Sequence, residues 1–137
     1  MEGVRRYEDL VAWQLCLAMS RVIFEMTQTG PSSKDLEFRN QIRKAADATA
    51  PLIAEGFVRY TTPEMVRYLR MARAELAEVQ THLQAGEDKR YFTPDQLERA
   101  RPAVNRAMGT TTNLLKAKLR QLEEERRRRT DKKARHR

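Results

Sequence analysis

The stretch QIRKAADATAPLIAEGFVR, residues 41–59, decides how the chain is expected to fold. Small residues recur at positions that would face a neighbouring helix: Ala45, Ala46, Ala48 and Ala50. Pro51 stands inside the apolar run, and Gly56 follows Glu55 near its end, where a glycine can adopt the positive φ that terminates a helix. A new helix start, Thr62-Pro63-Glu64, follows soon after. The stretch therefore predicts the crossing point of two closely packed helices.

The segment before this stretch predicts a first helix that is apolar on most of its sides. It should span residues 9–29, with Asp9 as its N-cap and Gly30-Pro31 as its stop. Its apolar residues form two stripes, the first being Leu10, Trp13, Leu17 and Phe24 and the second Val11, Leu15, Val22 and Met26. One stripe can enter the chain's own core, and the other needs a further partner. The second stripe is therefore a candidate interface with another copy of the chain, and a central helix in a monomer is the alternative.

Two further helices follow from proline, threonine and glycine signals. The second should begin near Ser33 and kink at Pro51, because proline donates no backbone hydrogen bond. Its expected buried stripe is Leu36, Ile42, Ala46, Ile53 and Phe57. The third should begin at Thr61 or Thr62 and end at Gly86. Its stripe has the most regular spacing of three and four residues in the chain: Met65, Tyr68, Leu69, Ala72, Leu76, Val79 and Leu83.

The fourth helix opens with the capping box Thr93-Pro94-Asp95-Gln96 and should bend at Pro102. Its expected stripe is Leu97, Ala100, Val104, Met108, Thr111, Leu115, Leu119 and Leu122. The glutamates at 123–125 precede the arginines at 127–129 by four residues, a spacing that stabilises a helix by about 0.2–0.5 kcal/mol per pair. The helix can therefore continue into the C-terminal segment, with fraying expected from Thr130 onward.

Four amphipathic segments joined by short loops predict an all-α fold, an up-down-up-down antiparallel four-helix bundle. The alternation of β-branched and aromatic residues that marks strands is missing. The bundle should occupy residues 1–125, and residues 126–137 should form a basic tail that is either a helical extension or disordered.

The positive charge of the chain is concentrated in that tail. The whole chain carries a net charge of +8, and residues 126–137 hold eight basic residues and one acidic residue, a net charge of +7. The body is therefore nearly neutral, and the basic pI describes the tail rather than a face of the domain. The candidate nucleic-acid-binding residues are Arg126, Arg127, Arg128, Arg129, Lys132, Lys133, Arg135 and Arg137. They suit sequence-independent contacts to phosphates, and a solvated tail without a ligand is the alternative.

Several function classes find little support in the residues. Cys16 is the only cysteine, which excludes an intramolecular disulfide and fits a reducing cytoplasm. No signal-peptide core and no apolar run long enough to span a bilayer is evident, so neither secretion nor a membrane role is expected. His82 and His136 lack the surrounding carboxylates that a di-iron bundle requires, and no phosphate-binding glycine loop or Ser, His and Asp set occurs. We expect no enzymatic activity, cofactor, metal or small-molecule substrate.

A set of charged residues around the central stretch has two interpretations. Arg43, Glu55, Arg59 and Glu78, together with Gly56, are candidates for a structural junction between the second and third helices. Arginine guanidinium groups match carboxylates in geometry, so ion pairs that hold the junction are the favoured interpretation. A contact with RNA or protein is the alternative.

Three groups of residues resemble a known bacterial family. The opening Tyr7-Glu8-Asp9-Leu10-Val11-Ala12-Trp13-Gln14 resembles the first signature of the four-helix-bundle proteins encoded by intervening sequences of 23S ribosomal RNA genes. Residues 41–46 and 53–56 resemble its second signature, and Arg59, Glu64, Leu69, Ala72 and Glu78 fall at the positions of the third. The chain departs from the pattern at Leu52, where the family usually has Asn, and at Glu75, where it usually has Ser.

This resemblance implies a four-helix bundle that assembles as a ring-like homopentamer. It also implies kinship with the accessory variability proteins of diversity-generating retroelements, which are basic pentamers that bind a reverse transcriptase and its RNA. Two functions therefore remain open. One is an RNA-associated accessory protein with a possible reverse-transcriptase partner, in which the tail binds RNA or another polyanion. The other is a structural or protein-interaction module with no direct nucleic-acid role.

Overall fold

The computed structural model describes residues 3–136, and these residues form helices and no strands. A 3-10 turn η1 (Tyr7–Asp9) is followed by α1 (Val11–Met26), α2 (Pro31–Lys34), α3 (Leu36–Val58), α4 (Thr62–Asp88) and α5 (Pro94–Arg135). The prediction of an all-helical bundle is confirmed. The short helix α2 was not expected as a separate element, because Gly30-Pro31 was interpreted as a helix stop and the next helix was expected to begin near Ser33.

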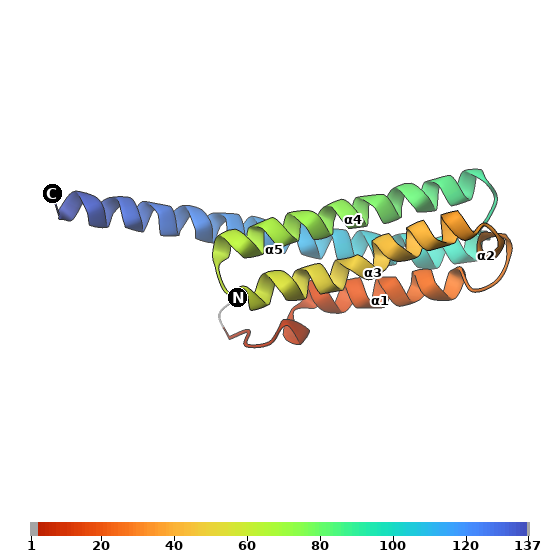
Figure 1. The fold of residues 1–137 in the computed structure, drawn as a ribbon, viewed down its shortest axis with the longest axis horizontal. Coiled ribbons are helices and arrows are strands. Elements are labelled where there is room, and N and C mark those ends of the chain that lie inside the picture. The colour runs from red at the N-terminus through yellow and green to blue at the C-terminus, as the bar shows by residue number, and fades with distance from the viewer. Residues whose placement is uncertain (1–2, 137) are drawn as a thin grey trace.

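The four long helices pack side by side around one apolar core (Figure 1). Helix α3 contacts α1 and α4, and α5 contacts α4 and α1, so each long helix has two long neighbours. The α3–α4 connection lies at one end of the bundle and the α4–α5 connection at the other. Helix α5 is longer than its partners and projects past the end at which α3 meets α4.

The expected stripe of α4 is confirmed, since all seven of its residues are buried. The core face of α1 follows neither expected stripe, since Met26 is the one buried residue of this helix that belongs to either of them. Its buried side chains are Ala12, Cys16, Met19, Ile23 and Met26. Because nearly every position of α1 is apolar, the periodicity could not show which direction faces the core. On α3, Leu36 is exposed rather than buried, since it is the first residue of the helix and lies at its rim.

Two helices begin later than expected. Helix α3 begins after Asp35 rather than near Ser33, and the Asp35 carboxylate accepts a hydrogen bond from the Phe38 N–H at 3.1 Å. Helix α1 begins after Leu10, because Asp9 is the last residue of η1. The capping box of α5 is confirmed: Thr93 accepts from the Gln96 N–H while the Gln96 side chain accepts from the Thr93 N–H.

The two glycines expected to end helices lie inside them. Gly56 and Gly86 are buried residues of α3 and α4, and neither has a positive φ. A Cβ at Gly56 would lie 2.7 Å from the Tyr68 Cβ, so glycine is needed there for the close approach of α3 and α4. The positive φ values in the turns after α3 and α4 belong to Tyr60 (69°) and Arg90 (58°).

Neither internal proline ends its helix. Pro51 lies within α3 and Pro102 within α5, and both helices continue past them. The bend expected at each proline stays a prediction. The fraying expected from Thr130 is wrong, because α5 continues to Arg135. The (i, i+4) pair between Glu123 and Arg127, at 2.7 Å, contributes to this helical extension.

Candidate nucleic-acid interface

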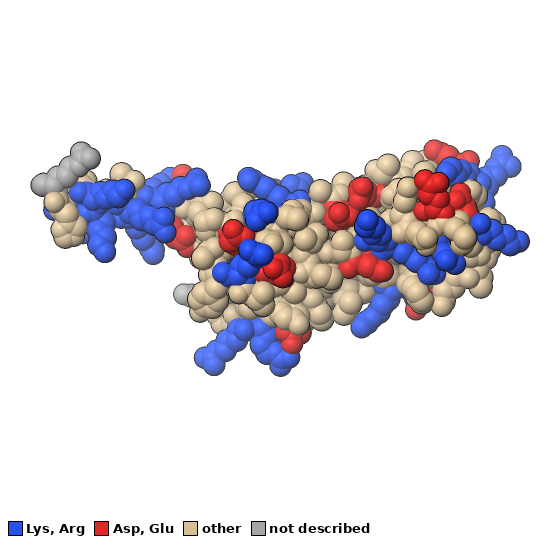
Figure 2. Space-filling model, viewed as in Figure 1, with Lys and Arg blue, Asp and Glu red and all other residues tan. Residues whose placement is uncertain are grey.

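The basic tail is a helical extension of α5. Every residue from Arg126 to His136 is exposed, and Figure 2 shows Lys and Arg side chains covering the part of the molecule that projects from the bundle. At 1.5 Å per residue, the basic residues between Arg126 and Arg135 span about 14 Å of helix axis. Arg137 lies outside the described residues.

Helical periodicity sorts the tail cations into two rows. Arg128, Lys132 and Arg135 are spaced by four and three residues and share one face. Arg126, Arg129 and Lys133 share a neighbouring face. Arg127 lies on the side of the helix that is opposite these two faces. Only Arg127 forms an ion pair within the tail region of the described chain. Six side chains of the tail are therefore available for phosphates on two faces of one helix.

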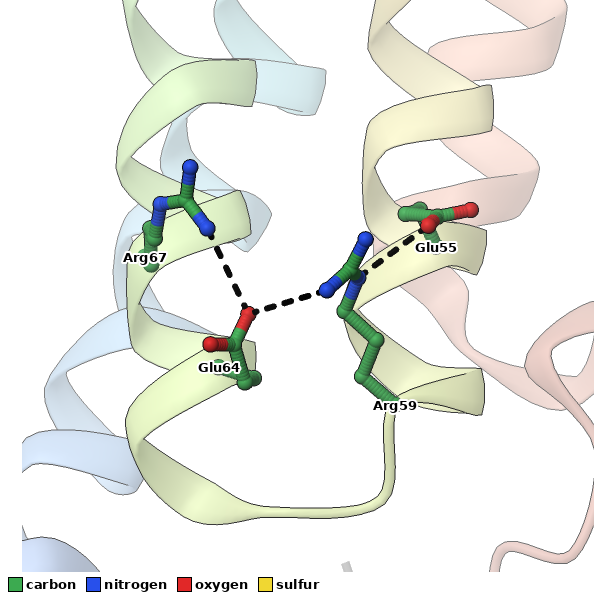
Figure 3. Close-up of polar contacts among 4 residues, drawn as sticks. All are labelled: Glu55, Arg59, Glu64 and Arg67. Carbon is green, nitrogen blue, oxygen red and sulfur yellow. Dashed lines mark hydrogen bonds and ion pairs between the residues drawn. The ribbon is translucent and has the colours of Figure 1, made fainter.

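An ion-pair cluster joins α3 to α4 at the predicted junction (Figure 3). Arg59 Nε donates to Glu55 Oε1 at 3.1 Å, and its Nη1 lies 3.7 Å from Glu64 Oε2. Arg67 Nη1 reaches the same Glu64 oxygen at 3.6 Å. The hydrogen bond that Arg59 donates to Glu55 raises the pKa of the Arg59 guanidinium, which also lies 5.0 Å from the Tyr68 ring centre. The arrangement supports a structural role for Glu55 and Arg59.

Arg43 was expected at this junction and lies elsewhere. Its Nε donates to Thr27 Oγ1 at 2.7 Å, and its Nη2 donates to the Phe24 carbonyl at 3.2 Å. The guanidinium also lies 4.4 Å from the centre of the Phe24 ring. Arg43 therefore ties α3 to the C-terminal end of α1, where carbonyl groups lack helical partners.

Glu78 was also expected at the junction, and it lies with Glu75 farther along α4. Burial raises the pKa of the Glu75 carboxyl group, and a hydrogen bond and charge repulsion from Glu78 act in the same direction. Lys44 of α3 opposes this shift. The spacing of three residues places both carboxylates on one helix face, so this is a like-charge pair rather than part of an ion-pair junction.

The interface candidates on α1 differ in exposure. Val11 is 56% exposed, Leu15 and Val22 are half-buried, and Met26 is 6% exposed. Met26 is therefore wrong as an interface residue, because it belongs to the chain's own core. Phe24 is 46% exposed and adds an aromatic ring to the accessible apolar surface of α1.

The other groups considered for chemistry are metal-binding clusters and the single cysteine. No cluster of three or more His, Cys, Asp and Glu residues that could hold a metal occurs among residues 3–136. Cys16 is fully buried and lies 3.9 Å from the Thr111 hydroxyl, and burial raises the pKa of its thiol. No helix in the described range is long and apolar enough to cross a membrane.

The helical fold and the signature residues agree with a comparison of the chain with known protein families. The family described as 23S rRNA-intervening sequence protein matches residues 8–113. The chain belongs to this family. No curated protein matches the chain. The family region covers α1 to α4 and the first half of α5, and it ends before the basic tail.

A groove at the α3–α4 end of the bundle was missed by the sequence analysis. It has a volume of about 670 Å³ and lies between the α3–α4 turn and one face of α5. Its lining includes Tyr60 and Thr62 from the turn side and Lys118, Arg120 and Glu124 from α5. These residues are more than 50 positions apart, so no local motif marks them. The only sequence signal is the apolar-to-polar change at Lys118, which interrupts the stripe of α5.

Proposed function

We propose that the chain is a non-enzymatic accessory protein of the cytoplasm that binds RNA, or DNA, through the basic extension of α5. The observation that carries this proposal is the exposed helical tail, in which a net charge of +7 belongs to residues 126–137. The remaining residues carry only +1, so a polyanion would be attracted to the tail and not to the bundle.

The tail supplies the kind of contact that dominates non-specific nucleic-acid binding. Each phosphate neutralised by Lys or Arg releases condensed counterions, and affinity then falls steeply with salt. A preformed helix requires less ordering on binding than a disordered basic segment does. Two rows of cations also allow contact with phosphates on two sides of the helix.

The proposal includes assembly as a ring-like homopentamer of up-down-up-down bundles. Connections at alternate ends of the bundle support this helix order. The accessible apolar residues Val11, Leu15, Val22 and Phe24 supply surface for a contact between copies. Five tails would together carry +35, and simultaneous contacts along one polyanion would strengthen binding well beyond that of a single tail.

A reverse transcriptase is the proposed protein partner. The support is the kinship with the accessory variability proteins of diversity-generating retroelements that the resemblance to the intervening-sequence family implies. A gene for a reverse transcriptase beside this reading frame favours that partner. A ribosomal RNA gene around the reading frame favours the intervening-sequence branch instead.

The test compares two full-length variants that lose the same number of charges. In the tail variant, Arg128, Lys132 and Arg135 become Gln, which preserves helix propensity. In the control, three exposed cations of the body outside ion pairs become Gln: Lys34, Arg70 and Arg106. Binding to a labelled single-stranded RNA is measured at several salt concentrations. We expect the tail variant to reduce the slope of log K against log salt by about 2, and the control to change it little.

A second candidate function is a protein-interaction module without a nucleic-acid role. The end of the family match at residue 113 favours it, because the tail then lies outside the shared region. Equal RNA affinity of the tail variant and the parent in low salt would support this candidate and refute the first. A partner protein retained in high salt by the tail variant would point the same way.

A further inference from the structure

The groove at the α3–α4 end lies beside the base of the tail. Its α5 wall is formed by Ala117, Lys118, Arg120, Gln121 and Glu124, and the tail begins two residues later. Lys118 and Arg126 are about 12 Å apart along the helix axis. A nucleic-acid strand that contacts the tail cations and continues toward the bundle would therefore reach the groove.

Tyr60 presents its ring at the edge of this groove without support from the core. Its side chain is 94% exposed, and its φ of 69° lies in the left-handed region. That conformation costs a residue other than glycine about 1–2 kcal/mol. Asn or Gly would make the same turn with less strain. Because so little of this side chain is covered by the protein, packing within the bundle does not explain an aromatic residue here. An exposed ring on a strained turn is a feature of binding sites.

Lys118 forms part of the floor of the same groove. It is only 8% exposed, and its Nζ donates to Gln121 Oε1 at 3.0 Å. Burial lowers the pKa of its ammonium group, and the charge of Glu125 partly offsets that shift. An ammonium has three donors, and Gln121 accepts one of them among the described residues. A buried cation with unused donors favours an anionic acceptor such as a phosphate oxygen.

Neighbouring polar side chains hold Lys118 and its hydrogen-bond acceptor Gln121 in place. Gln121 Nε2 donates to Thr62 Oγ1 at 3.2 Å, and Thr62 Oγ1 donates to Glu125 Oε1 at 2.8 Å. These bonds tie α5 to the first turn of α4, where free backbone N–H groups favour a negative charge. The polar wall of the groove is therefore fixed before a ligand arrives.

We propose that this groove binds one nucleotide of a single-stranded RNA, with its base stacked on Tyr60 and its phosphate held by Lys118 and Arg120. Aromatic rings that stack bases beside a basic track are the usual means of binding single strands. The inference rests on the proposed function, because the tail supplies the continuing track. It adds a requirement for an unpaired base, which a duplex or a polyanion without bases does not provide.

Glu124 is the one acidic residue of the groove lining. Its carboxylate would repel a bound phosphate, so the groove is not an optimal anion site. The proposal therefore predicts that Glu124→Gln tightens RNA binding, by about two- to fivefold at low salt. Glu98→Gln is the matched control, because Glu98 is exposed on α5 far from the groove and removes the same charge.

The test uses the full chain and two probes of opposite design. One is a fluorescent 12-nucleotide uridine RNA, and the other is inorganic polyphosphate, which has charge and no bases. Tyr60→Asn removes the ring and suits the positive φ, whereas Tyr60→Phe keeps a stacking surface. We expect Tyr60→Asn to weaken RNA binding about tenfold without changing polyphosphate binding, and Tyr60→Phe to bind RNA like the parent. Lys118→Met should weaken binding of both probes.

The outcomes separate this proposal from the proposed function. RNA binding that is unchanged in Tyr60→Asn, but lost in the tail variant, overturns the groove and leaves the tail function intact. An equal loss for RNA and polyphosphate in Tyr60→Asn also overturns base stacking. A parent chain that binds neither probe refutes both proposals. If Lys118→Met does not fold, Tyr60→Asn and Glu124→Gln still decide the result, since both residues lie at the surface.

Discussion

The close contact at Gly56 gives a sharp test of how α3 and α4 pack. Gly56→Ala would place a Cβ 2.7 Å from the Tyr68 Cβ and 3.1 Å from the Met65 Sδ. The Met65 side chain can move aside, but the Tyr68 Cβ is fixed to the backbone of α4. The two helices must therefore separate to admit the methyl group. Gly109→Ala is the matched control, because Gly109 also lies inside a helix and nothing is within 4 Å of its added Cβ.

The two substitutions should differ in their effect on the free energy of unfolding. Alanine in place of glycine inside a helix gains about 1 kcal/mol of helix propensity at both positions. Only Gly56→Ala adds the cost of overpacking, about 1–3 kcal/mol. We therefore expect Gly109→Ala to raise the free energy of unfolding by about 1 kcal/mol. The free energy of unfolding of Gly56→Ala should be about 1–3 kcal/mol lower than that of Gly109→Ala. The difference between the variants isolates the steric cost, because the propensity gain is common to both.

Urea unfolding followed by circular dichroism measures this difference. With a slope of about 2 kcal/mol per molar urea, the midpoints should differ by about 0.5–1.5 M. All chains must be compared at one protein concentration, since self-association would add to stability. A Gly56→Ala chain as stable as Gly109→Ala would refute the close approach of α3 and α4. A destabilised Gly109→Ala would instead show that another copy covers that surface of α5.

Three further predictions concern a helix cap and two carboxyl groups. Thr93→Ala removes the capping box of α5 and should lower the free energy of unfolding by about 1 kcal/mol in urea titrations. The hydrogen bond from the Tyr91 hydroxyl lowers the pKa of Asp35 in the folded state. The Asp35 carboxylate therefore stabilises the fold at pH values above its unfolded-state pKa, and this stabilisation is lost as the pH falls through the folded-state pKa. Asp35→Asn, which keeps an N-cap, should therefore be less stable than the parent at pH 7 and equal to it near pH 2. The pKa of Glu75 is raised in the fold by burial and Glu78, so Glu75→Gln should stabilise the chain at pH 7, and the gain should disappear in urea titrations below about pH 4.

Local signals predicted the elements that depend on local chemistry. The stripe of α4 was correct because polar residues clearly mark its exposed side. The capping box at Thr93 was correct because its two hydrogen bonds join residues three positions apart. Both features are determined within one or two turns of helix, so they need no knowledge of neighbouring helices.

Features that depend on neighbouring helices were not predictable in the same way. Helix α1 is apolar on most sides, so only its contacts with α3 and α5 decide that Met26 is buried and Val11 is exposed. Gly56 and Gly86 were assigned to helix ends because glycine suits both a positive φ and a close contact. The sequence does not distinguish these two uses, since the second depends on the residue that lies opposite.

In the candidate interface, too, features set by local sequence were predictable and features set by helix packing were not. The tail was predictable from composition, because its charges are consecutive in the sequence. The groove was not, because Tyr60 and Lys118 are 58 positions apart and meet only when α5 packs beside the α3–α4 turn. The junction was partly predictable: the Glu55–Arg59 pair follows helical spacing, but Arg43 depends on the position of α1.

The tail and the groove should respond differently to salt, because the tail offers charged side chains whereas the groove adds the aromatic ring of Tyr60. Tail contacts are exposed and weaken as counterions compete, and at 1 M salt the screening length is about 3 Å. Stacking on Tyr60 involves no net charge and should persist under those conditions. RNA that remains bound in high salt would therefore report the groove, and RNA released between low and high salt would report the tail. Because the rest of the body carries almost no net charge, it should contribute little to the RNA released by salt or to the RNA retained in high salt.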